Sequence, residues 1–488
     1  MTERDASQAH VIAIDQGTTN TKAVLIDSAG NMLAKASAPL KSSYPKPGWA
    51  EQSAEHIWVS VQAVICEIVA ANDVEVMGIA IANQRETLVV WDDETGKSIT
   101  PAILWQCRRT TKACDELRAG GADAAVVEVT GLSINALFPA SKLAWILQNV
   151  PEAKALADAG RLRAGTVDSW LLYKLTAGRE FATDHSNASR TQLFNTGTLN
   201  WDSALGEVFN VPLSVLPKPK PSDSLFGHTA NSSTALADGT PILAMMGDSH
   251  AALYGHGVRQ PGLVKATYGT GSSLMTLTAE RTPSRHGLSS TIAWTDRDGT
   301  AYALEGNITV SAQAASFVAT LLGLADAPAL SELAQSVPES GGVVFVPALA
   351  GLGAPHWNDS ATGTISGMTL ATQPAHIARA TLEAIALQIA DVFIAMENDM
   401  GARLKGLLAD GGASANDFLM QLQADVLDRS VTRASQAEVG AIGAAAMAFR
   451  SLGIDLLDGK DQAQSFNPKT LSVPQRTTLL QGWAEALP

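Results

Sequence analysis

Two short turns rich in glycine and hydroxyl side chains are the segments of this chain best suited to chemistry. The first is Asp-Gln-Gly-Thr-Thr-Asn at residues 15–20, and the second is Tyr-Gly-Thr-Gly-Ser-Ser at residues 268–273. Glycine lets the main chain approach a ligand, and successive N–H groups with Thr and Ser hydroxyls can surround phosphate oxygens. One such turn alone is most simply a hairpin connection. Two matched copies, one in each half of the chain, predict a clamp around the phosphates of one nucleotide. We call residues 15–20 the first phosphate turn and residues 268–273 the second phosphate turn.

Further residues fit a nucleotide and its metal ion. Asp15 ends an apolar run beside the first turn, where a carboxylate can reach Mg²⁺ directly or through water, although an aspartate can also simply start a turn. Asp-Gly-Gly-Ala at residues 410–413, followed by Asn416, supplies a glycine pair and a helix N-terminus that suit an adenosine and its phosphates. By itself this is a common strand-to-helix connection. The chain has no GxxxxGK[ST] loop and no GxGxxG after a strand, which argues against Walker and Rossmann nucleotide folds.

The elements that must position these residues follow from the apolar pattern. Apolar runs flank both turns, at 11–14 with 22–26 and at 262–267 with 274–277, so each copy predicts a β-hairpin. The pattern then predicts a third strand over 32–40, a helix capped by Ser53, a buried strand over 76–82, a hairpin over 87–105 and a stiff proline-rich loop over 212–221. Polar residues 83–86 directly follow the buried strand, the place where open α/β sheets bind ligands.

The second half repeats this plan. It predicts a helix over 374–399 stopped by Gly401, a strand over 404–409, a helix over 416–428, a strand near Val431 and a helix over 441–449. Strand hairpins followed by alternating helix and strand, occurring twice, predict two α/β domains of one type. We place the boundary just after Gly247-Asp248-Ser249, giving domains over 1–250 and 251–488, with the ligand in the cleft between them.

Composition excludes several classes of function. With 488 residues, of which 46% are hydrophobic and 17% charged, the chain is expected to fold as two domains or slightly more. A formal charge of -14 argues against a nucleic-acid or membrane partner, since either requires a basic face. The three cysteines are an odd number without zinc spacing and are expected to be reduced. Residues 1–10 lack an apolar signal core, and no segment approaches ~20 uninterrupted apolar residues, so a cytoplasmic location is expected.

Several irregular motifs follow one another along the chain, at residues 14–19, 83–87, 105–110, 166–171, 267–271 and 410–413. In this order they resemble the motifs of glycerol kinases of the FGGY carbohydrate kinase family, over nearly the whole chain. The resemblance implies two actin-like domains of the RNase H type with ATP and Mg²⁺ in the intervening cleft. It also implies transfer of the γ-phosphoryl group to a terminal hydroxyl of a polyol or sugar, in a homo-oligomer that is a dimer or tetramer.

The resemblance assigns roles to individual residues. Asp248 would be the general base and, with Asp15, would meet the metal ion. The acceptor would meet the hydrogen-bonding pair Arg85 and Glu86, the apolar wall Trp105, and Leu137, Ser249 and Ser273. The nucleotide would meet Thr18, Thr19, Lys22, Gly269, Thr270, Gly271, Ala312, Gly411, Gly412 and Asn416. Without the resemblance, Arg85 beside Glu86 is most simply a surface charge pair, and Asp248 is most simply the cap of a helix.

Three positions depart from the glycerol kinase pattern around the acceptor. Leu137 stands where a tyrosine is expected, Ser249 where a glutamine is expected, and Ser273 where an aromatic residue is expected. Each change removes bulk or a hydrogen-bond partner, and lost partners would cost a small triol on the order of 1–3 kcal/mol each. The departures predict a substrate longer than glycerol, with glycerol kinase proper as the close alternative.

Two other classes stay open on the residues alone. An actin-like ATPase switch or sugar sensor would need the phosphate turns, but it would leave Arg85, Glu86, Trp105 and Asp248 without a clear purpose. A pseudoenzyme that binds a sugar without turnover is opposed by the retention of both Asp15 and Asp248.

Overall fold

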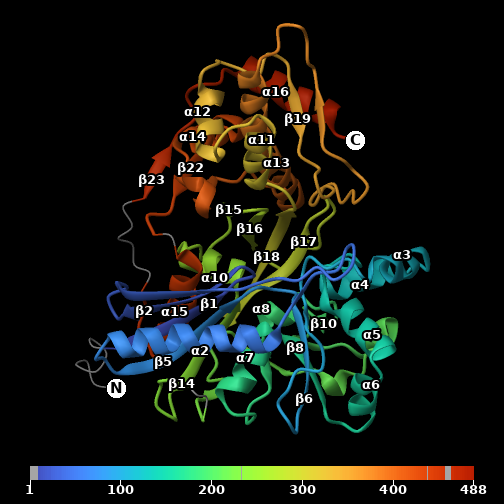
Figure 1. Ribbon diagram of the computed structural model, residues 1–488, viewed down its shortest axis with the longest axis vertical. Helices are drawn as coiled ribbons and strands as arrows, with labels where there is room; N and C mark the ends of the chain where they lie inside the picture. The colour runs from blue at the N-terminus through green and yellow to red at the C-terminus, as the bar shows by residue number, and fades with distance from the viewer. Residues whose placement is uncertain (1–8, 232–233, 437, 457–462) are drawn as a thin grey trace. The chain divides into compact units, whose positions relative to one another are not determined.

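The chain forms two compact units. The computed structural model describes residues 9–231, 234–436, 438–456 and 463–488 (Figure 1). The first unit comprises Met1–Val258, Ser290–Tyr302 and Glu438–Gly459, and the second comprises Arg259–Ser289, Ala303–Ala437 and Lys460–Pro488. The main break therefore lies close to the division predicted at residue 250, and two later segments return to the first unit. The assignment of domains over 1–250 and 251–488 stays a prediction.

The first unit contains most of the short elements. Its strands and helices before the break are β1 (His10–Gln16), β2 (Asn20–Asp27), β3 (Met32–Pro39), β4 (Glu51–Gln52), α2 (Ala54–Ala71), β5 (Val76–Asn83), β6 (Leu88–Asp92), β7 (Ala102–Ile103), α3 (Thr111–Ala119), α4 (Asp123–Thr130), α5 (Pro139–Asn149), α6 (Pro151–Asp158), β8 (Leu162–Thr166), α7 (Val167–Leu175), β9 (Ala182–Asp184), α8 (His185–Ala188), β10 (Phe194–Asn195), β11 (Asn200–Trp201), α9 (Ser203–Phe209), η1 (Leu213–Val215), β12 (Lys218–Lys220), β13 (Gly227–His228), β14 (Pro241–Gly247) and α10 (Asp248–Gly255). The returning segments add β17 (Ser289–Asp296), the start of β18 (Gly299–Ile308) and α15 (Val439–Ser451).

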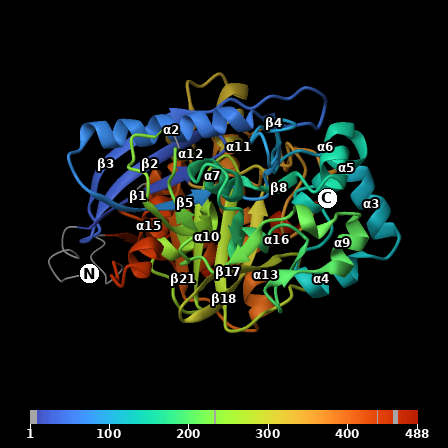
Figure 2. The same cartoon turned by 90° about the horizontal axis from the view of Figure 1, so that it is seen from below.

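The main sheet of the first unit has the strand order β13-β14-β5-β1-β2-β3. β1 pairs antiparallel with β2 and parallel with β5, and β5 pairs parallel with β14. Residues 11–14 of β1 are fully buried, because helices cover both faces of a sheet with parallel central strands. In Figure 2, α2 lies along β2 and β3, the strands that it contacts, while α15 contacts β1 and β5.

The second unit repeats this arrangement. Its elements are β15 (Leu263–Tyr268), β16 (Ser272–Thr278), the end of β18, α11 (Gln313–Leu321), α12 (Ala327–Gln335), β19 (Val344–Val346), β20 (Thr364–Ser366), α13 (Pro374–Met400), β21 (Gly406–Asp410), η2 (Gly412–Ala415), α14 (Asp417–Leu427), β22 (Ser430–Arg433), β23 (Gln464–Phe466) and α16 (Val473–Ala486). Its sheet runs β18-β16-β15-β21-β22-β23, with β15 antiparallel to β16 and parallel to β21. The order β3-β2-β1-β5-β14 in the first unit corresponds to β18-β16-β15-β21-β22 here, so two α/β domains of one type are confirmed.

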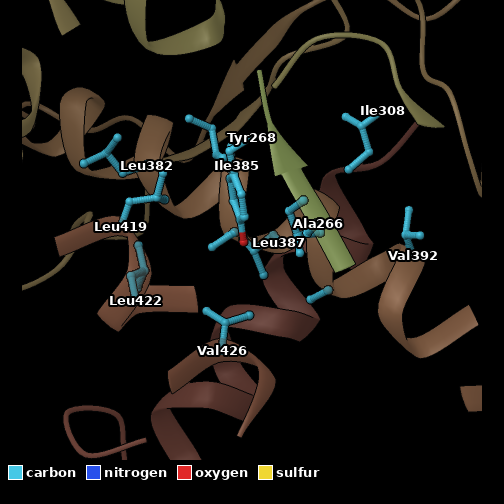
Figure 3. Close-up of a cluster of buried hydrophobic side chains, with 14 of the residues drawn as sticks. Ala266, Tyr268, Ile308, Leu382, Ile385, Leu387, Val392, Leu419, Leu422 and Val426 are labelled. Atoms are coloured by element: carbon cyan, nitrogen blue, oxygen red, sulfur yellow. The ribbon is translucent and has the colours of Figure 1, made fainter. Parts of the chain in front are cut away.

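The core of the second unit surrounds the strand that leads to its phosphate turn. Ala266 and Tyr268 on β15 lie among leucine, isoleucine and valine side chains from α13 and α14 (Figure 3). The phenol of Tyr268 donates a hydrogen bond to Oε1 of Gln423 at 2.9 Å. A buried Tyr with its hydroxyl satisfied fixes the end of β15 against α14.

Most predicted elements are found, and one loop is different. The helix predicted from Pro374 ends at Met400 with Gly401 in the left-handed conformation at φ 59°. The proline-rich stretch over 212–221 was predicted as a loop, but it contains η1 and the strand β12, which pairs with β9. This prediction was wrong because backbone pairing to β9 overrides the low strand propensity of proline at a sheet edge.

The helix α2 is long and apolar. By length and composition alone, α2 could cross a membrane. In the first unit, however, its side chains Ile57, Val61, Val64 and Ile65 are fully buried against the sheet, as in the core helix of a globular domain.

All three cysteines are free thiols, as predicted. The predicted absence of a signal core falls mostly on residues 1–8, which lie outside the described residues.

Candidate functional site

Arg85 and Glu86 follow directly after β5, and they do not pair with each other. Arg85 Nε donates to Asp248 Oδ1 at 3.0 Å, and Arg190 Nε donates to Glu86 Oε1 at 2.7 Å. Both Arg85 and Glu86 are buried, so the simplest interpretation, a surface charge pair, is wrong. The fold instead places the two neighbours in two separate ion pairs.

The backbone at Glu86 is held by a buried lysine. Glu86 has the unusual φ of 61°, and Lys142 Nζ donates to its carbonyl oxygen at 2.9 Å and to that of Leu137 at 2.7 Å. Burial lowers the pKa of Lys142 to about 7, against the opposing charge of Glu86. Lys142 thus links two residues predicted to meet the acceptor, Glu86 and Leu137.

Asp248 is the first residue of α10, directly after β14. Its side chain is 40% exposed, so part of the carboxylate is accessible beside the Arg85 guanidinium. Gly247 is required before it, because a Cβ there would come within 2.7 Å of Cγ and Cδ of Arg85. Gly247 is also the residue at the N-cap position, so Asp248 does not cap the helix. Ser249 follows, buried at 5% exposure, and its N–H donates to Asp248 Oδ1 at 2.6 Å.

The first phosphate turn joins β1 to β2. Gly17 N–H donates to Asn20 O at 3.0 Å and closes the turn, and Thr19 at its tip is exposed. Thr18 is half-buried, and its hydroxyl accepts a hydrogen bond from Trp105 Nε1 at 3.0 Å. The turn and the predicted apolar wall are therefore in direct contact.

Charges near this turn interact strongly. The pKa of Asp15 is raised to about 7, first by burial and then by Asp248, while Lys22 opposes the shift. Burial would lower the pKa of Lys22, but its hydrogen bond to Glu438 raises that pKa instead. Lys22 Nζ lies 2.8 Å from Glu438 Oε2.

The carboxylates Asp15 and Asp248 suit a magnesium ion. In the part of the chain that the structure describes, no group of three or more His, Cys, Asp or Glu could form a complete protein cage for a metal. Mg²⁺ does not need one, because it commonly takes one or two carboxylates and completes its shell with phosphate oxygens and water. A divalent cation would also offset the repulsion from Asp248 that raises the pKa of Asp15. The donor set therefore fits Mg²⁺.

In the second unit, the turn between β15 and β16 lies against the start of α11. Ser311 N–H donates to Thr270 O at 2.9 Å, and Ala312 N–H donates to Gly269 O at 3.1 Å. A Cβ at Gly271 would come within 2.4 Å of Ile308 O, so only glycine fits there. Gly269, Thr270, Gly271 and Ala312, all predicted nucleotide residues, are thus gathered together.

The glycine pair lies at the same end of this sheet. The parallel register pairs Thr267 with Asp410, so the turns after β15 and β21 leave the same sheet edge. Gly411 has φ 87°, and a Cβ there would come within 2.6 Å of Tyr268 O, whereas a Cβ at Gly412 would meet nothing within 4 Å. Asn416 caps α14 by accepting from Leu419 N–H at 3.1 Å. The backbone at Gly412 is consequently open to a ligand.

Ser273 lies on β16 of the second unit. Its hydroxyl donates to Oε1 of the fully buried Glu305 at 3.1 Å. Leu137 and Ser249, the other departures from the glycerol kinase pattern, belong to the first unit. Each unit therefore carries part of the predicted acceptor set.

Sequence reasoning missed Arg190 and Lys142. Both are long cationic residues that are fully buried, and each binds Glu86. Arg190 ends a polar run over 183–190 that matches no functional motif, and Lys142 lies on α5 among residues of an ordinary amphipathic helix. Only the structure shows that Arg190 binds the side-chain carboxylate of Glu86 and that Lys142 binds the backbone carbonyl of the same residue.

Comparison with known proteins gives the family of this chain. The model for the N-terminal domain of the FGGY family of carbohydrate kinases matches residues 10–255, and the model for the C-terminal domain matches residues 264–452. Apulose kinase from Pectobacterium atrosepticum is 49% identical over 448 residues, covering 91% of this chain and 90% of that protein. A glycerol kinase from Symbiobacterium thermophilum is 44% identical over 491 residues, covering 99% of this chain and 98% of that protein.

A solved structure of a related protein has the same fold. The crystal structure of Plasmodium falciparum glycerol kinase with ADP has a TM-score of 0.91 at 32% identity, covering 98% of this chain and 97% of that chain. These relatives give no support to the alternative of an ATPase switch or sugar sensor. The chain belongs to the FGGY family of carbohydrate kinases and is an ATP-dependent polyol or carbohydrate kinase.

Proposed function

We propose that this kinase transfers the γ-phosphoryl group of ATP to a terminal hydroxyl of a polyol or sugar longer than glycerol. The observation that carries the proposal is the set Leu137, Ser249 and Ser273, where the glycerol kinase pattern has larger or better hydrogen-bonding side chains. A second support is the 49% identity to a protein named apulose kinase, because that name gives an acceptor other than glycerol. Removing bulk around a small acceptor favours a longer one.

Most of the residues proposed for the acceptor belong to the first unit. Arg85 and Glu86 hold neighbouring hydroxyls of the acceptor, one donating and the other accepting, and Trp105 packs on its carbon chain. Asp248 takes the proton of the attacking hydroxyl. Because Arg85 Nε lies 3.0 Å from Asp248 Oδ1, one guanidinium both orients the base and binds the substrate.

The residues proposed for the nucleotide occur in each of the two units. Thr18, Thr19 and Lys22 of the first unit bind phosphate oxygens, as do Gly269, Thr270, Gly271 and Ala312 of the second. Gly411, Gly412 and Asn416 lie along the adenosine. Asp15 and Asp248 would hold Mg²⁺, which would neutralise phosphate charge when bound. Phosphoryl transfer depends mainly on alignment and charge neutralisation, which these groups supply.

A panel of acceptors tests the proposal. We expect kcat/KM for apulose, for a ketopentose or for a pentitol to exceed that for glycerol when ADP release is measured with saturating ATP and Mg²⁺. Tetritols and other ketopentoses complete the panel. Glycerol winning by tenfold or more would overturn the proposal in favour of glycerol kinase proper, the alternative supported by the 44% identical relative.

Restoring the glycerol kinase side chains provides the matched control. The triple variant Leu137→Tyr, Ser249→Gln, Ser273→Phe is expected to shift the ratio of kcat/KM toward glycerol by tenfold or more, or about 1.4 kcal/mol. An unchanged ratio would show that these positions do not set acceptor length.

A cytoplasmic location and a dimeric or tetrameric state belong to the same proposal, and size-exclusion chromatography with light scattering tests the oligomeric state.

A further inference from the structure

The side-chain amide of Gln84 lies at the centre of a buried polar network in the first unit. Its Oε1 accepts from the hydroxyls of Thr18 at 3.2 Å and Thr87 at 2.9 Å. Its Nε2 donates to Oε1 of Gln16 at 3.1 Å and to Oε1 of Gln52 at 3.2 Å. Gln84 is only 2% exposed, so both ends of the amide are satisfied by protein alone.

Trp105 fixes the direction of these hydrogen bonds. An N–H group can only donate, and Trp105 donates from Nε1 to Thr18 Oγ1 at 3.0 Å and from its backbone N to Thr87 Oγ1 at 3.3 Å. Each threonine hydroxyl therefore accepts from Trp105 and directs its own proton to Gln84. Gln84 must then present its oxygen to the hydroxyls and its NH₂ group to Gln16 and Gln52.

The network connects two parts of the site that serve different ligands. Gln16 and Thr18 belong to the first phosphate turn, whereas Thr87 directly follows Glu86 in the chain and Trp105 is a predicted acceptor residue. Gln84 is bonded to both sets directly. Gln52 reinforces the turn, because its Nε2 also donates to Thr18 O.

We infer that Gln84 is a positioning residue that couples nucleotide binding at the first phosphate turn to the position of Trp105 in the acceptor site. The Thr18 hydroxyl already uses its proton for Gln84. A phosphate oxygen that accepts the hydrogen bond of the Thr18 hydroxyl replaces Gln84 Oε1 and rotates that hydroxyl, to which Trp105 Nε1 donates. A phosphate oxygen bound only by Thr18 N–H or by exposed Thr19 instead tightens the turn around the intact network. Either event changes the surroundings of the Trp105 indole N–H.

This inference rests on the proposed function only in assuming that a nucleotide phosphate reaches this turn. Leaving a buried amide unsatisfied has a substantial free-energy cost, so the network transmits a displacement better than an exposed contact would. A free-energy coupling of this kind is reciprocal, so acceptor binding also changes nucleotide affinity.

The indole N–H signal of Trp105 tests the inference without turnover. In ¹H–¹⁵N spectra of the full chain, with the signal assigned by its loss in Trp105→Phe, saturating Mg²⁺ and the non-hydrolysable ATP analogue AMP-PNP are expected to shift it. The Trp201 indole, which donates to Pro217 O at 2.7 Å outside the network, serves as an internal reference. Thr18→Ser keeps the hydroxyl and is expected to keep the shift, while Thr18→Val and Gln84→Met are expected to abolish it.

A binding experiment measures the size of the coupling. Mg²⁺ and AMP-PNP together are expected to change the affinity for the best acceptor of the panel at least fivefold in the wild type and in Thr18→Ser, and less than twofold in Thr18→Val. Gln106→Met is the control for losing an amide, because Gln106 follows Trp105 but donates to Tyr44 outside the network. A purely structural role for Gln84 would lower stability and leave these ratios unchanged.

The outcomes separate the two proposals. AMP-PNP binding without a shift of the Trp105 signal would overturn the inference alone. A kinase that binds AMP-PNP and shows the shift, but prefers glycerol, would overturn the proposed substrate class alone. If Gln84→Met does not fold, the Thr18→Ser and Thr18→Val pair still decides the matter.

Discussion

Lys22 Nζ lies 2.8 Å from Glu438 Oε2, although 416 residues separate them. Glu438 is the first residue of the segment that returns to the first unit, and its side chain is buried at 5% exposure. Lys35 contacts the other oxygen of the same carboxylate. The cation predicted to face the transferred phosphoryl group is thus anchored by an acid from the far end of the chain.

Neutralising this acid tests whether it positions Lys22. We expect Glu438→Gln to lower kcat about tenfold, equivalent to about 1.4 kcal/mol, with the acceptor KM within twofold of wild type. Lys35→Met is the control, because the Lys35 side chain is 43% exposed and exposed ion pairs contribute only about 0–1 kcal/mol. Steady-state kinetics measure both variants, and equal effects on kcat would contradict a specific role for Lys22.

The assigned base gives a second prediction. Asp248→Asn should lower kcat by about 10² or more, the usual contribution of a general base. Nucleotide affinity, measured by calorimetry without metal, should change little. The side chain is partly exposed, so a large loss of thermal stability is not expected. Turnover within threefold of wild type would exclude the role.

Loss of the buried ion pair between Arg190 and Glu86 should lower the free energy of unfolding strongly. Arg190→Met leaves a buried carboxylate without this partner and is expected to lower the free energy of unfolding by about 3–5 kcal/mol, measured in urea. Arg403→Met breaks an ion pair whose arginine is 69% exposed and should cost less than about 1 kcal/mol. Similar losses in the two variants would show that burial of the first pair has no energetic consequence.

The pH dependence of stability should reflect Asp168. Burial, and then the nearby Asp184, raises the pKa of Asp168 to about 7 in the folded chain, above the unfolded value of about 3.9. The folded chain therefore holds the extra proton, and this stabilising contribution is complete below pH ~4 and is lost as pH rises through about 7.

Asp168→Asn removes this titration. The stability of the wild type relative to Asp168→Asn should fall by at least about 1.4 kcal/mol, one pKa unit, between pH 5 and pH 8. Urea unfolding at intervals of one pH unit measures it. A difference that is constant with pH would contradict the raised pKa.

The glycine pair offers a matched comparison. Gly411→Ala places a Cβ 2.6 Å from Tyr268 O at a φ of 87°, and we expect it to destabilise the fold by more than about 1 kcal/mol. Gly412→Ala meets no neighbour and should change stability by less than about 0.5 kcal/mol. If adenosine lies on this backbone, Gly412→Ala should still weaken ATP binding tenfold. Unchanged ATP affinity in Gly412→Ala would move the adenosine elsewhere.

The predicted elements are those whose signals are local. Both hairpins, the long helix from Pro374 and the strand before residues 83–86 follow from apolar periodicity, a glycine stop and turn chemistry, and all are present. The strand β12 was missed because its stability comes from pairing with β9, a partner more than thirty residues away whose register no local pattern encodes. Family resemblance then supplied candidate roles that periodicity alone could not.

The sequence by itself determined that the chain repeats one α/β plan and carries glycine turns and carboxylates suited to a nucleotide and its metal. These features depend on neighbouring residues, and short-range backbone geometry is sufficient to create them. Only the tertiary structure decided that Arg85 binds Asp248, that Arg190 and Lys142 both bind Glu86, and that Gln84 joins the phosphate turn to Trp105. Such pairings arise when distant segments are buried together, because buried charges and amides must find partners wherever the fold brings them.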